Sequence, residues 1–220
     1  MLGLYIGIIL LLNIPYVQHR MSVLVAKELS TVLGSELTVG RINIGLLNRI
    51  IIDDLVLNDQ SGKELLKIGR LSAKFEILPL FSGKISIGNV QLFSFNANLE
   101  RPTPQASTNF QFVLDAFASK DTVKKKSNLD LRINSLLIRR GKVSYDVLSA
   151  ESTPGKFNPQ HIRLSNILAN ISLKALQNDS VNAAIKRMSV EEEHSGFELK
   201  KLSLKIIANN RKMRIENFAI

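Results

Sequence analysis

The sequence repeats one short pattern of apolar residues over most of its length. In residues 84–101, KISIGNVQLFSFNANLER, Ile85 and Ile87 alternate with polar neighbours, and the alternation slips by one residue before it resumes at Val90 and Leu92. Alternation of this kind is typical of a strand with one buried face. With h for an apolar residue and x for any residue, the pattern hxhxxhxh occurs in nine copies, which start at Leu37, Ile50, Leu66, Ile85, Leu131, Ile162, Ala183, Phe197 and Met213.

The two residues at each slip are polar or glycine. A slip of one residue would normally turn the following side chains to the other face of the sheet. A β-bulge absorbs the slip, keeps the apolar side chains on one face and coils the sheet, although some of these pairs would also suit tight turns. The pattern predicts a mainly β fold, a curled and bulged antiparallel sheet that forms an open apolar groove. The slips lie at Gly40-Arg41, Asp53-Asp54, Gly69-Arg70, Gly88-Asn89, Asn134-Ser135, Ser165-Asn166, Lys186-Arg187, Lys200-Lys201 and Glu216-Asn217.

The composition is typical of a folded chain and limits the kinds of ligand and partner that the chain can bind. Charged residues make up 22% and apolar residues 45% of the 220 positions, which argues against a disordered chain. The chain has no cysteine, so disulfide frameworks and thiolate metal sites are excluded. The formal net charge of +10 favours an anionic neighbour, either nucleic acid or an anionic lipid surface. Nucleic acid is disfavoured, because the basic residues are spread along the strands without stacking aromatic residues beside them.

The first 34 residues predict a membrane anchor followed by a helix. Residues 1–17 carry no charged side chain and no small-x-small cleavage site follows them, so we expect an uncleaved signal anchor or transmembrane segment. The apolar run would reach about 24 Å as a helix, which is short for a hydrocarbon core of about 30 Å. We expect the chain from residue 18 onward to lie outside the cytoplasm, although the basic residues that follow the apolar run favour the opposite orientation. A buried core helix is the alternative to a membrane anchor. Residues 18–34 predict an amphipathic helix that ends at Gly34.

Three further segments follow from the pattern. Residues 35–119 predict a first β-groove segment, residues 120–128 a charged linker, and residues 129–220 a second β-groove segment that continues in a longer protein. Within the first segment, residues 110–117 predict a helix that covers part of the sheet, because their apolar side chains recur at helical spacing.

Individual strands are delimited by turn residues. Arg139 to Lys142, Arg-Arg-Gly-Lys, predict a hairpin turn with glycine at its tip. The predicted strands are residues 37–47, 49–58, 65–76, 84–101, 129–138, 143–147, 161–173, 181–190, 197–208 and 211–220.

The sequence contains no recognisable catalytic arrangement. His19, His161 and His194 are scattered without metal-ligand spacing, so we expect no metal and no cofactor. Asp53 and Asp54 are the best carboxylate pair, but adjacent strand residues point to opposite faces and cannot share a proton unless a bulge brings them together. We therefore expect no enzymatic activity.

The order of several segments resembles that of a known family. It is similar to the N-terminal part of the TamB-like branch of the AsmA superfamily, closest to versions from the Bacteroidota, over nearly all of residues 1–190. The segments that carry the resemblance are PYVQ at 15–18, LTVGRINI at 37–44, IDDLVLND at 52–59, ILPLFSGKISI at 77–87 and LLIRRGKVSYD at 136–146.

The resemblance implies a repeating β-groove, related in architecture to the chorein-type bridge proteins of eukaryotes. Such a protein is a single-pass protein of the bacterial inner membrane whose bulk crosses the periplasm towards the outer membrane. Members are associated with phospholipid transport and with assembly of outer-membrane proteins, so an outer-membrane barrel is an expected partner.

The residues give a separate reason to expect phospholipid as the ligand. Two one-sided helices cannot hide the apolar face of nine strands, so acyl chains or a missing part of the protein must cover it. One alternative is a scaffold whose free edge pairs with strands of client outer-membrane proteins, and another is a closed sandwich with a structural role. The predicted groove-lining residues are Ile85, Ile87, Val90, Leu92, Leu131, Ile133, Leu136, Ile138, Ile162, Leu164 and Ile167.

Overall fold

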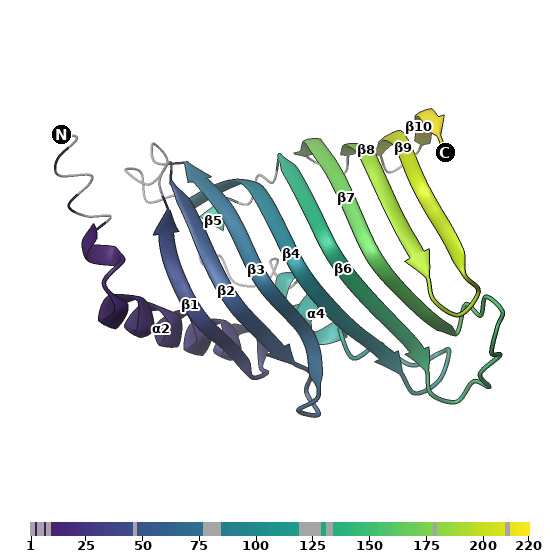
Figure 1. Cartoon of the computed structure of the whole chain (residues 1–220), viewed down its shortest axis with the longest axis horizontal. Coiled ribbons are helices and arrows are strands. Elements are labelled where there is room, and N and C mark those ends of the chain that lie inside the picture. Colours follow the sequence, from purple (N-terminus) through teal and green to yellow (C-terminus); the bar gives the residue numbers. More distant parts are fainter. Residues whose placement is uncertain are drawn as a thin grey trace.

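The alternating segments form one long row of strands with helices α2 and α4 against it (Figure 1). The computed structural model describes residues 3, 7, 10–45, 48–76, 85–118, 129–130, 134–177, 180–209 and 212–220. The elements are α2 (Pro15–Leu33), β1 (Leu37–Gly45), β2 (Arg49–Asn58), β3 (Glu64–Glu76), β4 (Ile85–Arg101), α4 (Gln111–Ala118), β5 (Leu129–Asp130), β6 (Ser135–Val147), β7 (His161–Gln177), β8 (Ser180–Glu192), β9 (Phe197–Asn209) and β10 (Met213–Ala219).

All strands join one sheet, which is mixed instead of antiparallel. Its order is β1-β2-β3-β4-β6-β7-β8-β9-β10, with the short β5 beside β4, and the described strands do not close into a barrel. Neighbours are antiparallel except that β4 pairs with β5 and β6 in parallel, so the prediction of a purely antiparallel sheet is wrong here. Parallel neighbours need a crossover connection, and α4 lies in the connection from β4 to β6. The strands of both predicted groove segments therefore belong to one sheet.

The predicted hairpin at residues 139–142 is wrong, because β6 runs through it without a turn. Arg140 adopts a left-handed φ of 55°, which bends the strand. A Cβ placed on Gly141 would lie 2.8 Å from Cζ and 2.9 Å from Cδ1 of Phe95 on β4, and closer still to Cε1. Glycine is required at this position because the ring of Phe95 occupies the space of a side chain.

Several of the predicted slips are β-bulges, where two residues of one strand face one residue of its neighbour. Three lie at the predicted pairs: Gly88-Asn89 against Lys74, Lys186-Arg187 against Ser203, and Lys200-Lys201 against Ser189. A fourth predicted pair, Ser165-Asn166 on β7, faces Lys142 of β6, while the bulge of β7 towards β8 lies one residue further on, as Asn166-Ile167 against Val190. On β10 the bulge also lies one residue further on, as Asn217-Phe218 against Leu204. The bulge interpretation is therefore confirmed for the slips on β4, β7, β8 and β9, and on β10 the bulge lies one residue from the predicted pair.

On β1 to β3 the slip has a different cause. The register there stays one to one, with Gly40 opposite Asp54 and Asp54 opposite Gly69. Asp54 has a left-handed φ of 56°, and Ser94, which faces Gly69 from β4, has one of 53°. A Cβ on Gly40 would lie only 3.0 Å from Cβ of Asp54. The bulges predicted on these strands are wrong, because neighbouring strands bend together at left-handed residues that face glycines.

Both predicted helices are present, and they cover the β1 to β4 end of the sheet. Gly34 ends α2 with a left-handed φ of 65°, and its amide donates to the Ser30 carbonyl at 2.8 Å. Leu33 of α2 and Val113 of α4 pack with Leu65, which is only 1% exposed, and with neighbouring leucines of β1 and β2. This cluster is the main apolar core among the described residues, and it fixes both helices to the sheet.

Some predictions fall wholly or partly outside the described residues. These include the linker at 120–128 and part of the anchor at 1–17, of which the structure describes residues 3, 7 and 10–17. Among the described residues, no helix is both long and apolar enough to cross a membrane.

Candidate functional site

Two rows of apolar side chains run across the sheet, perpendicular to its strands. Residues directly opposite one another on neighbouring strands point to the same face, so the register defines each row. Eight strands about 4.8 Å apart give the rows a length of about 34 Å. We call them the apolar rows: Ile42, Ile52, Leu71, Leu92, Ile138, Ala169, Met188 and Leu202 form the first, and Ile44, Ile50, Ala73, Val90, Leu136, Ile171, Ile185 and Leu204 form the second.

The structure brings four of the predicted groove-lining residues together on these rows. Val90 and Leu136 face each other across β4 and β6 on the second row, and Leu92 and Ile138 do so on the first. All four are half-buried.

Other predicted lining residues lie further along β7. Ile162 pairs with Tyr145 and Leu164 with Val143, whereas Ile167 lies opposite Gly141 and is buried. The side chains of Ile85 and Ile87 lie outside the described part of the structure. Leu131 and Ile133 lie outside it altogether.

The apolar rows extend beyond the part of the sheet that the helices cover. In the described part of the chain, α2 packs on β1, and α4 lies behind β3 and β4 (Figure 1). No described helix packs across β7, β8 or β9, which contact their neighbouring strands. Met188, Leu202 and Leu204 are nevertheless only half-buried. The rows thus present apolar surface for which the described residues supply no cover.

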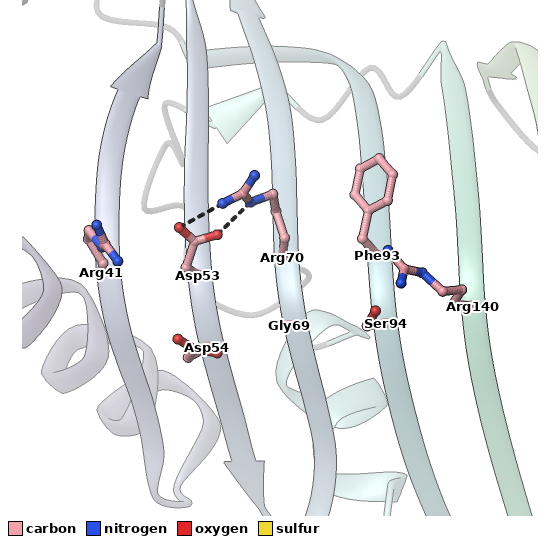
Figure 2. Close-up of a pocket in the computed structure, with 8 residues that line it drawn as sticks. All are labelled: Arg41, Asp53, Asp54, Gly69, Arg70, Phe93, Ser94 and Arg140. Carbon is pink, nitrogen blue, oxygen red and sulfur yellow. Dashed lines mark hydrogen bonds and ion pairs between the residues drawn. The ribbon is translucent and has the colours of Figure 1, made fainter.

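The two candidate carboxylates have different environments (Figure 2). Asp53 Oδ1 accepts a hydrogen bond from Arg70 Nε at 2.6 Å, and Oδ2 accepts one from the same guanidinium at 3.2 Å. Asp54 is exposed at the left-handed position. This bidentate pair positions Arg70 beside Phe93 on the next strand, in a pocket of about 460 Å³. The arrangement pairs Asp53 with a cation instead of pairing the two carboxylates for proton transfer.

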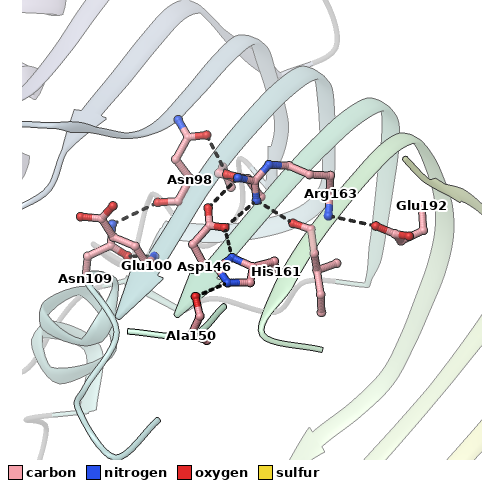
Figure 3. Close-up of polar contacts among 11 residues, drawn as sticks. Asn98, Glu100, Asn109, Asp146, Ala150, His161, Arg163 and Glu192 are labelled. Atoms are coloured by element: carbon pink, nitrogen blue, oxygen red, sulfur yellow. Dashed lines mark hydrogen bonds and ion pairs between the residues drawn. The ribbon is translucent and has the colours of Figure 1, made fainter. Parts of the chain in front are cut away.

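A second polar cluster joins the ends of β6 and β7 (Figure 3). Asp146 Oδ1 accepts a hydrogen bond from Arg163 Nη1 at 3.0 Å, and Oδ2 forms an ion pair with Arg163 Nη2 at 2.8 Å. His161 Nδ1 lies 2.9 Å from Asp146 Oδ1, and its Nε2 lies 3.0 Å from the Ala150 carbonyl oxygen. Both partners of the ring are acceptors, so both contacts are hydrogen bonds only when His161 is a doubly protonated imidazolium.

The pKa values of this cluster follow from its geometry. The Asp146 carboxylate, and then the Ala150 carbonyl, raise the pKa of His161 above its ordinary value. Burial alone would raise the pKa of Asp146, but the hydrogen bonds from Arg163 and His161 lower it. The charged forms of both groups are therefore favoured, and the imidazolium ties the loop at Ala150 to the sheet.

Glu192 at the end of β8 holds the following turn. Its side chain is buried and accepts hydrogen bonds from the Ser195 hydroxyl at 2.5 Å and the Ser195 amide at 2.8 Å. Burial alone would raise the pKa of Glu192, but these bonds, with those from the His194 and Arg163 amides, lower it to about 2. The buried charge is thus neutralised by donors, which indicates a structural turn cap.

The cluster at Asp146 and the turn cap at Glu192 were not predicted from the sequence. Asp146, His161 and Arg163 come together through the β6–β7 register, and a sequence shows no register between strands that are joined by a long loop. The alternation His161-x-Arg163 at the start of a strand was the available signal, because residues two apart share a face. Within the described residues, no group of three or more histidine, aspartate or glutamate side chains could hold a metal ion.

No family model matches the chain, and no curated protein matches it significantly.

Proposed function

We propose that the apolar rows form the floor of a curled, open groove that carries phospholipid acyl chains. The observation behind this proposal is their continuity, because the same two rows run for eight strands and extend past the strands that α2 and α4 cover. One leaflet of a bilayer core is roughly 15 Å thick, half of about 30 Å. The rows, at about 34 Å, are longer than one acyl chain and offer it successive positions.

The energetic role of such a surface is to remove a barrier. Each CH₂ group exposed to water costs about 0.8 kcal/mol, so a sixteen-carbon chain is held in a bilayer by on the order of 12 kcal/mol. An acyl chain that lies on Val90, Leu92, Leu136 and Ile138 keeps most of its surface against apolar side chains. Movement along the rows then becomes a series of small steps of similar free energy, and it needs no covalent chemistry.

The cellular setting rests on the resemblance to the TamB-like branch of the AsmA superfamily. In this proposal the chain is a single-pass protein anchored in the bacterial inner membrane, and its strands cross the periplasm towards an outer-membrane barrel. It transports lipid without acting as an enzyme, and it binds neither a cofactor nor nucleic acid.

The free edge at β10 supports a second function, an assembly scaffold for outer-membrane proteins. Within the described residues, β10 pairs only with β9, whereas the opposite edge strand β1 is flanked by α2. Met213, Ile215 and Phe218 on β10 are 65%, 52% and 60% exposed. Native proteins usually block such edges, and an open one can add a strand from a client protein.

A transfer assay with matched charge substitutions tests the lipid proposal. Leu92→Asp with Ile138→Asp places two carboxylates on the first apolar row, while Gln91→Asp with Leu137→Asp places them on the directly adjacent pair, which faces the other way. The purified variants are compared for transfer of fluorescent phospholipid between vesicles.

We expect the Leu92/Ile138 variant to lose transfer and the Gln91/Leu137 variant to keep it. An open face can hydrate the new carboxylates, so circular dichroism should show both variants folded. Equal transfer by both variants would contradict the proposal. Equal transfer by both charge variants, together with loss of client-strand pairing in an Arg214→Pro variant of β10, would instead favour the scaffold.

A further inference from the structure

The bends of neighbouring strands form a line across the sheet. Asp54 on β2, Ser94 on β4, Arg140 on β6 and Asn166 on β7 all have left-handed φ values, between 50° and 56°. Left-handed non-glycine residues are uncommon, and each costs of order 1–3 kcal/mol unless the surrounding structure enforces it. Here the register places them at the same level of successive strands, so the bend continues from strand to strand.

This line forms a furrow, which we call the transverse furrow, made of three adjoining pockets. The first pocket, shown in Figure 2, spans β1 to β6. The second pocket shares Phe93 and Arg140 with the first pocket. It shares Asn166 and Ser189 with the third pocket, which extends to β9. In Figure 2 the helical ribbons lie behind the strands that carry the side chains of the first pocket. Seven strand spacings of about 4.8 Å give the furrow a length of about 34 Å, which suits a polymer better than a small molecule.

Arginines occur along the furrow on every second strand. Arg41, Arg70, Arg140 and Arg187 lie on β1, β3, β6 and β8, so their strands are about 10 Å apart. Arg70 is held by Asp53. Among the described residues, Arg41, Arg140 and Arg187 are exposed and have no hydrogen-bond or ion-pair partner. The three unpaired arginines are therefore separated by four and two strand spacings, about 19 and 10 Å. The pocket linings also contain the carboxylates of Asp54, Glu191 and Glu198, of which Glu191 accepts a hydrogen bond from Asn166 and Glu198 lies 3.9 Å from Lys200.

From this placement we infer that the transverse furrow binds an extended anionic polysaccharide that carries about one carboxylate per disaccharide. The carboxylates of such a chain are spaced on a scale comparable with two strand spacings, so that successive or alternate carboxylates can meet the unpaired arginines. Its hydroxyl groups suit the exposed hydroxyl of Ser94 and the pair formed by Asn166 and Glu191, in which the Asn166 amide donates to Glu191 Oε2 at 2.6 Å. The ring of Phe93 offers an apolar surface to a sugar ring.

Other extended anions fit the furrow less well. Nucleic acid places a phosphate every 3.4 Å along each strand, which is about three charges for each arginine interval, and Phe93 is the one aromatic residue that lines the three described pockets. An extended peptide binds sheets by adding to a free edge, whereas the furrow crosses the middle of strands that, apart from β1, are paired on both sides.

The experiment measures binding of hyaluronan oligosaccharides to the full chain by isothermal titration calorimetry. An uncharged N-acetylglucosamine oligomer of the same length and a poly-glutamate peptide are the comparison probes. The test variant combines Arg41→Gln, Arg140→Gln and Arg187→Gln. The matched control removes the same charge outside the furrow, by Lys27→Gln, Lys156→Gln and Arg214→Gln. Circular dichroism verifies that both variants fold.

We expect hyaluronan to bind and the furrow variant to weaken binding at least about tenfold, as the loss of three ion pairs implies, while the control variant binds as the parent does. Restoring Arg140 alone should regain part of the affinity, and phospholipid transfer should be unchanged. Absence of hyaluronan binding, equal weakening by both variants, or equal affinity for poly-glutamate would overturn the inference.

Discussion

Gly141→Ala tests the packing that bends β6. A Cβ at this position would lie 2.8 Å from Phe95 Cζ and closer to Cε1, whereas carbon atoms pack at about 3.5–4.0 Å. The ring of Phe95 must therefore retreat by roughly 1 Å or more. Overpacking of this size costs about 1–3 kcal/mol, and the lower entropy of the unfolded alanine variant returns about 0.4–1 kcal/mol. We expect the free energy of unfolding to fall by about 1.3 kcal/mol, the difference between the midpoints of these two ranges.

Urea denaturation of the purified protein measures this change. Gly88→Ala is the matched control, because its Cβ would meet nothing nearer than Asn134 Nδ2 at 3.5 Å. We expect this variant to be as stable as the parent or more stable by up to about 1 kcal/mol, because alanine lowers the entropy of the unfolded chain. In a Phe95→Leu background, Gly141→Ala should cost much less, with a coupling energy of about 1 kcal/mol or more. A neutral Gly141→Ala, or strict additivity with Phe95→Leu, would refute the explanation of this glycine.

Three further predictions concern the buried and polar contacts. Leu65→Ala should lower the free energy of unfolding by about 2–5 kcal/mol, because this side chain is 1% exposed in the core, whereas Leu92→Ala, on the open rows, should cost less than half as much in the same urea titration. The stabilising contribution of His161, whose pKa is raised, should be complete below the ordinary histidine pKa of about 6.5 and disappear as the pH rises through the folded value. His161→Gln should abolish this pH dependence of thermal unfolding, and an unchanged profile would contradict the imidazolium assignment. Ser195→Ala should raise the pKa of Glu192 from about 2, as carboxyl NMR titration would show; an unchanged pKa would mean that the other donors suffice.

Local patterns predicted most strand positions in this fold. Period-two alternation depends only on adjacent residues, and the boundaries of β1 to β4 and β7 to β10 agree with it to within a few residues. Gly34 at the end of α2 was likewise a local signal. The slips also carried real information, because most correspond to bulges or to left-handed residues on their strands.

The features that escaped prediction depend on contacts between distant segments. Arg-Arg-Gly-Lys reads as a turn, but the ring of Phe95 explains the glycine, and that contact exists only because β4 and β6 pair in parallel. The transverse furrow is likewise a product of register, since Asp54, Ser94 and Asn166 are ordinary polar residues in the sequence. The apolar rows were partly predictable, because Val90, Leu92, Leu136 and Ile138 follow from alternation, whereas their alignment with Met188 and Leu202 does not.

Photo-crosslinking in cells tests the central claim about the apolar rows most directly. A photoreactive residue is placed at Leu92 or Ile138, and as controls at Gln91 or Leu137, which form the adjacent pair on the opposite face. Phospholipid adducts are then identified by mass spectrometry. A lipid-carrying face predicts phospholipid adducts at Leu92 and Ile138 and few at Gln91 and Leu137, because side chains alternate between the faces of a strand. Equal capture at both pairs, or protein adducts alone, would contradict the account.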